Sequence, residues 1–314
     1  MITNDMQLRM KKGIAKVHAA LELGGGHTIL STGITGDDSR LAKAVCDVGV
    51  KMVEPNHPAV ALARGHKGVT TMHAAEQIRY EITVAQMAEV TRGVRSVVPD
   101  DVYITVGIPG GFTEIVPMPL RDEDFTMMAL AGADGLHTHK SSLRDLESIV
   151  ETAHRYGLLV DAYIGMTTDL HTFGLPADTP EDVYRTAREM ESIGTDMIGL
   201  MTGMSYEGVQ AGEIHPMIKE RLNALVDAVQ VPTLAEGGIN TTNFKAFKDT
   251  KVNILVIGTS IDKMVKKVEV VRSDEAQQKE QVPRDHVGQE SDGQGDGADD
   301  EVISTCCIKT GIAK

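Results

Sequence analysis

The segment DGLHTH carries two histidines, His137 and His139, that are separated by a single residue. If this segment is a β-strand, both side chains point to the same face, because successive side chains of a strand alternate. Two imidazoles in this arrangement could share a cation such as zinc or manganese. Glu54, Asp161 and Glu236 end or interrupt other apolar runs and could add oxygen ligands. The predicted metal set is His137, His139 and Glu54; the alternative is that the histidines hold no metal and only form hydrogen bonds.

The same side chains are candidates for acid/base catalysis. His139 and Glu54 end their apolar runs, and Asp161 lies inside the run VDAYI. A buried acid needs a partner, so Asp161 either orients a catalytic group or is satisfied by backbone N–H groups. The sequence thus predicts a catalytic set of His139, Glu54, Asp161 and His137.

Two glycine-containing segments between residues 234 and 261 could bind an anion. They read LAEGGINTTNF and LVIGTSI. Glycine lets backbone N–H groups approach an anion closely, and Thr259 and Ser260 in the second segment start a helix whose N-terminus favours negative charge. The alternative is that these glycines only make tight turns. The predicted phosphate-binding residues are Gly237, Gly238, Gly258, Thr259 and Ser260.

Three other features could contribute to a site. Lys140 follows His139 and could form a Schiff base, although a one-residue offset favours a solvated lysine that points away from the histidines. The connection 55–72, which holds His57, Arg64, His66 and Lys67 and is followed by His73, could be a lid over an anionic substrate or an ordinary surface loop. The segment TGMSYEGVQAGE is a second candidate lid.

Eight short β-branched runs alternate with longer amphipathic segments. The strands and helices that this alternation predicts would position the candidate catalytic and phosphate-binding residues. Alternating strands and helices predict a parallel sheet, and eight such units can close into a (β/α)8 TIM barrel. In such a barrel the catalytic groups stand at the carboxyl ends of the strands. An open doubly wound sheet is the alternative, but no G-x-G-x-x-G follows the first strand. A single long helix is predicted from His73 to about Val97.

The predicted organisation has three parts: an extra N-terminal helix within residues 1–27, the barrel over 28–272, and an acidic tail over 273–314. The tail is rich in Asp, Glu, Gln, Gly and Ser. Because such a composition buries little apolar surface, we expect disorder there. A frameshifted or otherwise foreign end would have the same appearance.

Charge and composition indicate which kinds of partner and which cellular location to expect for this protein. The net charge of −14 argues against nucleic acid, which requires a basic surface. The chain has three cysteines, two of them adjacent, so no disulfide framework is expected, and no apolar run suggests a signal peptide or a membrane span. We expect a cytoplasmic protein that binds a small phosphorylated substrate and that could form a homo-oligomer.

The GGIN and IGTSI pair resembles the ribulose-phosphate-binding barrel superfamily over roughly residues 28–270. That group includes hexulose-6-phosphate synthase, thiamine-phosphate synthase, ketogulonate-phosphate decarboxylase and N-acetylmannosamine-6-phosphate epimerase. The segment GADGLHTHKSSLRD is similar to the fourth strand of the hexulose-phosphate synthase group, with His139 in the place of its histidine. Glu54 in MVEPNHP resembles the glutamate that ends the second strand.

One departure limits this resemblance. The group carries D-x-K-x-x-D at the end of the third strand, whereas this chain has ITVGIPGG. Decarboxylation or formaldehyde addition by that machinery is therefore not expected. The predicted function is epimerisation or aldol-type cleavage of a phosphorylated sugar or sugar acid through an enediolate. The alternatives are a metal-dependent hydrolase that uses His137 and His139, and a barrel that binds a phosphorylated ligand without catalysis.

Overall fold

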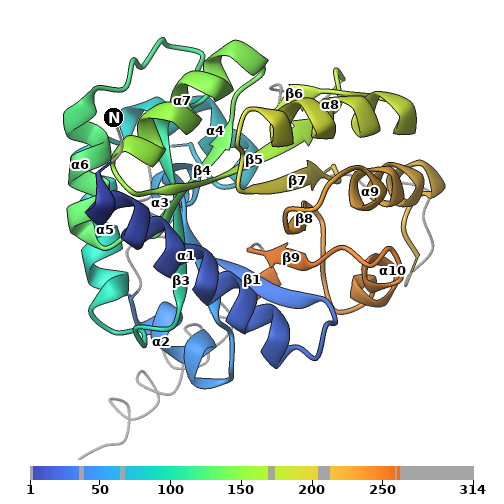
Figure 1. Ribbon diagram of the computed structural model, residues 1–314, viewed down its shortest axis with the longest axis horizontal. Helices are drawn as coiled ribbons and strands as arrows, with labels where there is room; N and C mark the ends of the chain where they lie inside the picture. Colours follow the sequence, from blue (N-terminus) through green and yellow to red (C-terminus); the bar gives the residue numbers. More distant parts are fainter. Residues whose placement is uncertain are drawn as a thin grey trace, which may run out of the picture. The chain divides into compact units, whose positions relative to one another are not determined.

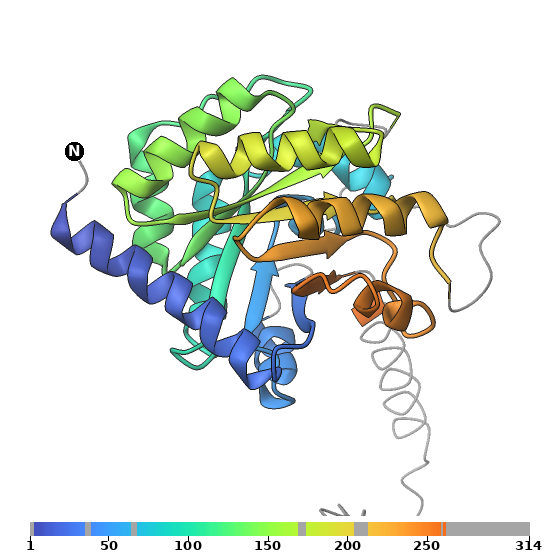
Figure 2. The same ribbon diagram turned by 45° about the vertical axis from the view of Figure 1, so that its right-hand side comes forward.

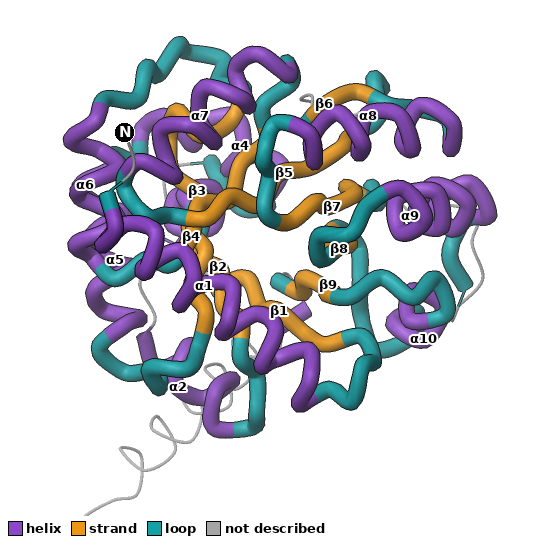
Figure 3. Tube along the Cα trace, viewed as in Figure 1, coloured by secondary structure: helices purple, strands orange, loops and turns teal. Residues whose placement is uncertain are grey.

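The computed structural model describes residues 3–34, 39–63, 68–168, 174–203, 213–258 and 260–261. Its strands form one parallel sheet in the order β4-β3-β2-β1-β9-β8-β7-β5, and a further pairing of β4 with β5 closes the ring. The short strand β6 pairs with the end of β5. Figure 3 shows the strands surrounded by helices. The predicted (β/α)8 barrel is therefore confirmed.

The strands are β1 (Ile29–Ile34), β2 (Met52–Pro55), β3 (Tyr103–Phe112), β4 (Gly135–His139), β5 (Leu159–Gly165), β6 (Leu175–Pro176), β7 (Met197–Met201), β8 (Thr233–Glu236) and β9 (Ile254–Ile257). The helices are α1 (Asn4–Leu23), α2 (Ser39–Asp47), α3 (His57–Ala63), α4 (Met72–Ile78), the 3-10 turn η1 (Arg79–Glu81), α5 (Val84–Arg95), α6 (Asp122–Ala131), α7 (Leu143–Arg155), α8 (Pro180–Ser192), α9 (Pro216–Ala228) and α10 (Phe244–Lys248).

The interior of the barrel is filled by alternate residues of the strands. Its apolar part is a separate cluster of buried side chains that includes Met52, Tyr103, Leu159, Tyr163, Met197, Leu234 and Ile254. The other strand residues pack against the helices in a second, larger cluster. Two glycines make room for the tyrosines: a Cβ at Gly135 would overlap Tyr103, and a Cβ at Gly199 would overlap the ring of Tyr163.

Helix α1 covers the amino-terminal end of the barrel, as Figures 1 and 2 show in dark blue. Val17 of α1 is fully buried and belongs to the interior cluster. Lys16 Nζ lies 2.8 Å from Asp134 Oδ1, next to the start of β4. The guanidinium of Arg9 donates to the backbone carbonyls of Ala129 and Ala133. These contacts join α1 to the bottom of the strands.

One predicted helix is wrong. The sequence suggested a single helix from His73 to about Val97, but the chain forms α4, η1 and α5 instead. Ile82 is extended (φ −81°, ψ 133°), and Thr83 begins α5 with a capping box that uses the side chain of Gln86. The cap satisfies the first N–H groups of α5 and so favours a new helix start at Thr83 over continuation.

The predicted connection over 55–72 is also partly wrong, because α3 lies within it. The acidic tail over 273–314 lies outside the described residues, as do Arg64, His66 and Lys67 of the first candidate lid, the side chain of His73, and most of the second lid. None of the helices that the structure describes is both long enough and apolar enough to cross a membrane.

We expect Gly199→Ala to lower the free energy of unfolding by about 1–3 kcal/mol, because overpacking next to the buried ring of Tyr163 forces side chains to shift. Gly93→Ala is the matched control: it lies in helix α5, and an added Cβ there meets no atom within 4 Å. A small gain of about 0.5–1 kcal/mol is expected at Gly93. Urea unfolding measures both. Equal effects of the two substitutions would contradict the assigned packing of Tyr163.

Candidate functional site

Five ionisable side chains from four strands converge inside the carboxyl-terminal end of the barrel: Glu54 of β2, His137 and His139 of β4, Asp161 of β5 and Glu236 of β8. Strand pairing places His137 beside Asp161. Glu54, His137, His139 and Asp161 are each at most 4% exposed. The side chain of Glu236 is 20% exposed and is the member that solvent reaches. The structure thus brings together the four residues of the predicted catalytic set, and adds Glu236.

A chain of hydrogen bonds connects the centre of this cluster. Asp161 Oδ2 lies 2.7 Å from His137 Nδ1, and His137 Nε2 lies 2.6 Å from His139 Nε2. The hydroxyl of Thr105 donates to the other oxygen of Asp161. Asp161 is therefore satisfied by two side chains, and the alternative that backbone N–H groups satisfy it does not describe these contacts.

Two further carboxylates flank His137. Its Nε2 lies 3.6 Å from Glu54 Oε1 and 3.8 Å from Glu236 Oε2. Glu54 Oε1 accepts a hydrogen bond from Asn56 Nδ2 at 3.1 Å. The second oxygen of Glu54, Oε2, is buried and has no hydrogen-bond partner among the residues that the structure describes.

Burial and charge set the protonation of these groups. Burial alone would lower the pKa of His137, but the carboxylates of Glu54 and Asp161 raise it to about 10. Burial, reinforced by the charge of His137, holds the pKa of His139 well below its usual value. Burial raises the pKa of Glu54 to about 8 and also raises that of Glu236. The cluster therefore combines an imidazolium at His137 with a neutral imidazole at His139.

Aromatic rings fix the orientation of His139. The ring of Phe112 stacks on it with a centroid distance of 4.6 Å and an interplanar angle of 5°. The ring of Tyr163 stacks at 4.8 Å and 14°. Phe112 is the last residue of β3 and pairs with His139 of β4. Nothing in the sequence pattern marks Phe112, because it follows Pro109-Gly110-Gly111, a tripeptide that is typical of the end of a strand but lies inside β3 here.

Behind Phe112 lies a buried charged network that the sequence analysis also missed. Arg79 is 2% exposed; its Nε donates to Glu114 Oε2 at 2.9 Å and its Nη1 to Glu76 Oε2 at 2.5 Å. His57 Nε2 lies 3.2 Å from Glu114 Oε1. The guanidinium carbon of Arg79 lies 5.2 Å from the centroid of the Phe112 ring. His57 is thus a buried partner of Glu114, not a solvated lid residue.

The predicted phosphate-binding glycines lie beside the cluster. Gly237 and Gly238 follow Glu236 directly and adopt positive φ angles of 107° and 69°, which glycine adopts without strain. The side-chain amide of Asn243 donates to the carbonyl of Gly238 at 3.0 Å. Ser260, which follows β9 and Gly258, donates from Oγ to the carbonyl of Ile239 at 3.2 Å and so links the two loops. Thr259 lies outside the described residues.

Lys140 stands apart from the histidines. Its Nζ donates to the carbonyl of Phe112 at 2.7 Å, and burial lowers its pKa. This bond directs the ammonium to the backbone of β3. A Schiff-base role is therefore not supported by the geometry.

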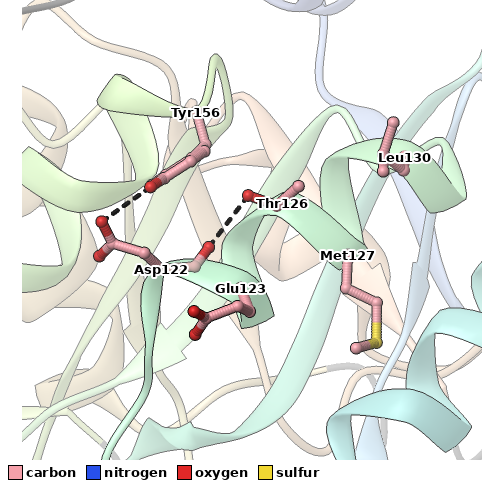
Figure 4. Close-up of a pocket in the computed structure, with 6 residues that line it drawn as sticks. All are labelled: Asp122, Glu123, Thr126, Met127, Leu130 and Tyr156. Carbon is pink, nitrogen blue, oxygen red and sulfur yellow. Dashed lines mark hydrogen bonds between the residues drawn. The ribbon is translucent and has the colours of Figure 1, made fainter.

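A surface pocket of about 440 Å³ lies on the outer helical layer, between α6 and the end of α7. It is lined by Asp122, Glu123, Thr126, Met127, Leu130 and Tyr156. Figure 4 shows the Tyr156 hydroxyl bonded to Asp122, with a distance of 2.7 Å to Oδ2. The pocket shares no residue with the cluster inside the barrel, so we do not assign the chemistry to it.

The comparison with known sequences finds distant relatives. No protein-family model matches the chain. Imidazole glycerol phosphate synthase subunit HisF of Campylobacter concisus is 27% identical over 220 residues, covering 68% of this chain and 79% of that protein. The same subunit of Elusimicrobium minutum is 31% identical over 156 residues, covering 48% and 56%. The chain thus spans little more than half the length of the second relative.

Solved structures share the barrel at low sequence identity. The 2,3-dimethylmalate lyase of the PEP mutase/isocitrate lyase superfamily has a TM-score of 0.55 and 14% identity, over 93% of this chain and 92% of that one. Phosphonopyruvate hydrolase, solved with oxalate and Mg²⁺, has a TM-score of 0.57 and 12% identity, over 84% and 87%. These similarities support the (β/α)8 barrel that the sequence resemblance implied. Assignment to the hexulose-phosphate synthase group or its sister families stays a prediction.

We expect the stability of the metal-free protein to fall as the pH rises through the range in which Glu54 ionises. The pKa of Glu54 is about 8 in the folded chain against 4.5 for an ordinary glutamate. A carboxyl with a raised folded pKa stabilises fully below the unfolded value, and this contribution is lost as the pH rises toward the folded value. Glu54→Gln removes it.

Urea unfolding at about pH 5 and about pH 8, in the presence of a chelator, measures this difference. The parent should lose stability relative to Glu54→Gln between the two pH values. Glu147→Gln, an exposed substitution on α7, is the control and should follow the parent. Parallel pH profiles of the parent and Glu54→Gln would rule out a raised pKa at Glu54.

Proposed function

We propose that this chain is an enzyme of the isomerase or lyase type that acts on a phosphorylated sugar or sugar acid. Its reaction is the removal of a proton from a carbon next to a carbonyl, which gives an enediolate. The observation that carries the proposal is the buried chain Asp161–His137–His139 beside the unpartnered oxygen of Glu54. These hydrogen-bonded residues lie at the end of the barrel where (β/α)8 enzymes place their catalytic groups.

Anchoring of the substrate is assigned to the loops after β8 and β9. Gly237 and Gly238 directly follow Glu236, so a phosphate bound at this turn lies at the edge of the histidine cluster. The bond from Ser260 to Ile239 holds the two loops together. Backbone N–H groups of glycine loops bind phosphate oxygens without a competing side chain.

Glu54 is the proposed base. Its pKa of about 8 lies near neutral pH, where a general base is most effective. Its Oε2 atom has no hydrogen-bond partner in the part of the chain that the structure describes, so this oxygen can accept the proton. As the C–H bond breaks, the proton passes to Glu54 and the electron pair moves into the enediolate.

His137 and His139 are the proposed electrophilic side of the site. The negative charge develops on the carbonyl oxygen. The imidazolium of His137 is already fixed in the protein and can stabilise this charge without reorganisation. Asp161 keeps His137 oriented through the 2.7 Å bond to Nδ1. Protonation of the other face of the carbon gives an epimer. In aldol-type cleavage the same enediolate forms when the neighbouring C–C bond breaks, the departing carbon leaves as an aldehyde, and the base takes the proton of its hydroxyl group.

The comparisons support the class and leave the substrate open. The relatives found by sequence are named imidazole glycerol phosphate synthase, and the compound in this name is a phosphate ester. Structural neighbours include 2,3-dimethylmalate lyase and oxaloacetate acetylhydrolase. A metal-dependent hydrolase is the second candidate, because two histidines and Glu236 come close enough to share an ion.

We expect Gly258→Asp to abolish binding of phosphorylated ligands while the fold is retained. An added Cβ at Gly258 would lie 3.8 Å from Gly33 Cα, an ordinary contact, so the main change is a negative charge at the anion site. Calorimetric titration with ribulose 5-phosphate measures the affinity. Gly258→Asn tests the shape without the charge, and Gly93→Asp tests the charge elsewhere; both should bind more tightly than Gly258→Asp. Unchanged affinity in folded Gly258→Asp would refute the phosphate site.

We expect Glu54→Gln and His139→Ala each to lower turnover by at least about 100-fold, the usual scale for a positioned acid or base. Affinity for the phosphorylated ligand should change much less. The measurement is exchange of carbon-bound protons for deuterium in D₂O, followed by NMR on ribulose 5-phosphate and dihydroxyacetone phosphate. Glu147→Gln is the control on α7 and should exchange as the parent does.

The three candidate functions give different results. Exchange by the parent that Glu54→Gln loses supports the proposal. Exchange that survives in both variants shows that the roles assigned to Glu54 and His139 are wrong. Binding without exchange or hydrolysis of either compound favours a ligand-binding barrel, and hydrolysis without exchange favours the hydrolase.

A further inference from the structure

The two histidines of β4 present the same type of atom to each other. His137 Nε2 and His139 Nε2 are 2.6 Å apart, and both rings are buried. Two neutral imidazoles with lone pairs in this position repel each other, so either a proton or a cation must lie between them. Two nitrogen ligands at about 2.0–2.1 Å from one metal ion are separated by about 3 Å or slightly more. A small rotation of the side chains therefore converts the observed arrangement into a metal-binding one.

The surroundings of His137 select Nε2 as the ligand atom. Its Nδ1 faces Asp161 Oδ2 at 2.7 Å, which places the ring proton at Nδ1 and leaves Nε2 to coordinate. Thr105 holds the other oxygen of Asp161. A carboxylate behind a histidine is the usual support of a metal-ligating imidazole, because it fixes the ring and raises its basicity.

A third ligand atom comes from β8. One ligand atom from each of His137, His139 and Glu236 lies within 4.8 Å of the other two. Three buried or largely buried carboxylates, those of Glu54, Asp161 and Glu236, lie around His137. The guanidinium of Arg79 is already paired with Glu76 and Glu114. A divalent cation would place positive charge next to these carboxylates.

We propose that His137 Nε2, His139 Nε2 and the carboxylate of Glu236 bind one divalent transition-metal ion of the zinc, manganese or cobalt type. Two imidazoles and one carboxylate favour these borderline ions over magnesium and calcium, which prefer oxygen ligands alone. The third ligand predicted from the sequence was Glu54; in this proposal Glu236 replaces it, and Glu54 stays free to act as the base.

The ion deepens the proposed function at the same site. Three protein ligands leave coordination positions open, and Glu236, which is 20% exposed, marks the side from which a substrate oxygen can enter. A bound ion would stabilise the enediolate oxygen in place of the proton between the two rings. The proposal rests on the proposed function for this role only, because metal binding can be measured without any substrate.

The experiment uses the full-length chain with Cys306→Ser and Cys307→Ser, so that the two adjacent thiols do not contribute. After removal of metals with a chelator, the protein is titrated with Co²⁺, followed by visible absorption and equilibrium dialysis. We expect one Co²⁺ per chain, displaced by Zn²⁺. Glu236→Gln and His139→Gln should each weaken binding at least about 10-fold, and Asp161→Asn about 10- to 100-fold.

Two substitutions are matched controls. Glu54→Gln removes a neighbouring carboxylate that is not a proposed ligand. His154→Gln removes a histidine outside the site, one that pairs with Asp196 at 2.8 Å. Glu54→Gln should still bind one Co²⁺ and lose less affinity than Glu236→Gln does, and His154→Gln should bind with the affinity of the parent. Circular dichroism checks the fold of each variant, and zinc X-ray absorption of the parent counts the imidazole ligands if a variant does not fold.

The outcomes separate the possibilities. Absence of bound Co²⁺ in the parent overturns the proposal, as does parent-like binding by folded Glu236→Gln and His139→Gln. Loss of binding in Glu54→Gln but not in Glu236→Gln overturns the ligand set. An X-ray absorption signal without two imidazoles does the same. One bound ion without proton exchange on the substrates upholds this site and counts against the proposed function, whereas exchange without any bound ion does the reverse.

Discussion

Burial of three carboxylates inside one barrel is the constraint on which the rest of this structure depends. Glu54, Asp161 and Glu236 come from three different strands and lie around His137. A carboxylate removed from water is stable only when hydrogen bonds or positive charge replace its hydration. His137 supplies the positive charge, and its raised pKa expresses how strongly the three acids favour the imidazolium. Removal of His137, or of the carboxylates around it, would leave uncompensated charge in an apolar interior.

The surrounding packing holds this arrangement in place. Tyr163 reaches His139 because the neighbouring β7 residue is Gly199, which leaves space for the ring. Phe112 stacks on the same imidazole and is contacted in turn by Arg79 and His57. Phe112 therefore connects the charged network of Arg79 to the imidazole of His139. A side chain held by packing on several sides has few alternative rotamers, which keeps its geometry fixed.

Much of the site could be predicted because strands have a strict period of two residues. That period places His137 and His139 on one face, and the order of strands and helices places the ends of β2, β4, β5 and β8 around one opening. The contacts of Phe112 and Arg79 could not be predicted in this way. Phe112 lies beyond a Pro-Gly-Gly turn that looks like the end of a strand, and Arg79 lies in a segment that periodicity alone reads as one helix. Both positions depend on tertiary pairing, which a single sequence does not display.

Helix α1 limits the routes by which small molecules can reach the histidine cluster. Val17 closes the interior cluster from below, and Lys16 and Arg9 fasten the helix to the turn before β4. Because side chains fill the interior and α1 covers the end below it, the histidine cluster exchanges molecules with solvent through the other end, on the side of Glu236. A reactant and its product must then use the same opening in turn. The two cannot flow through the barrel in one direction, so departure of the product has to precede each new arrival.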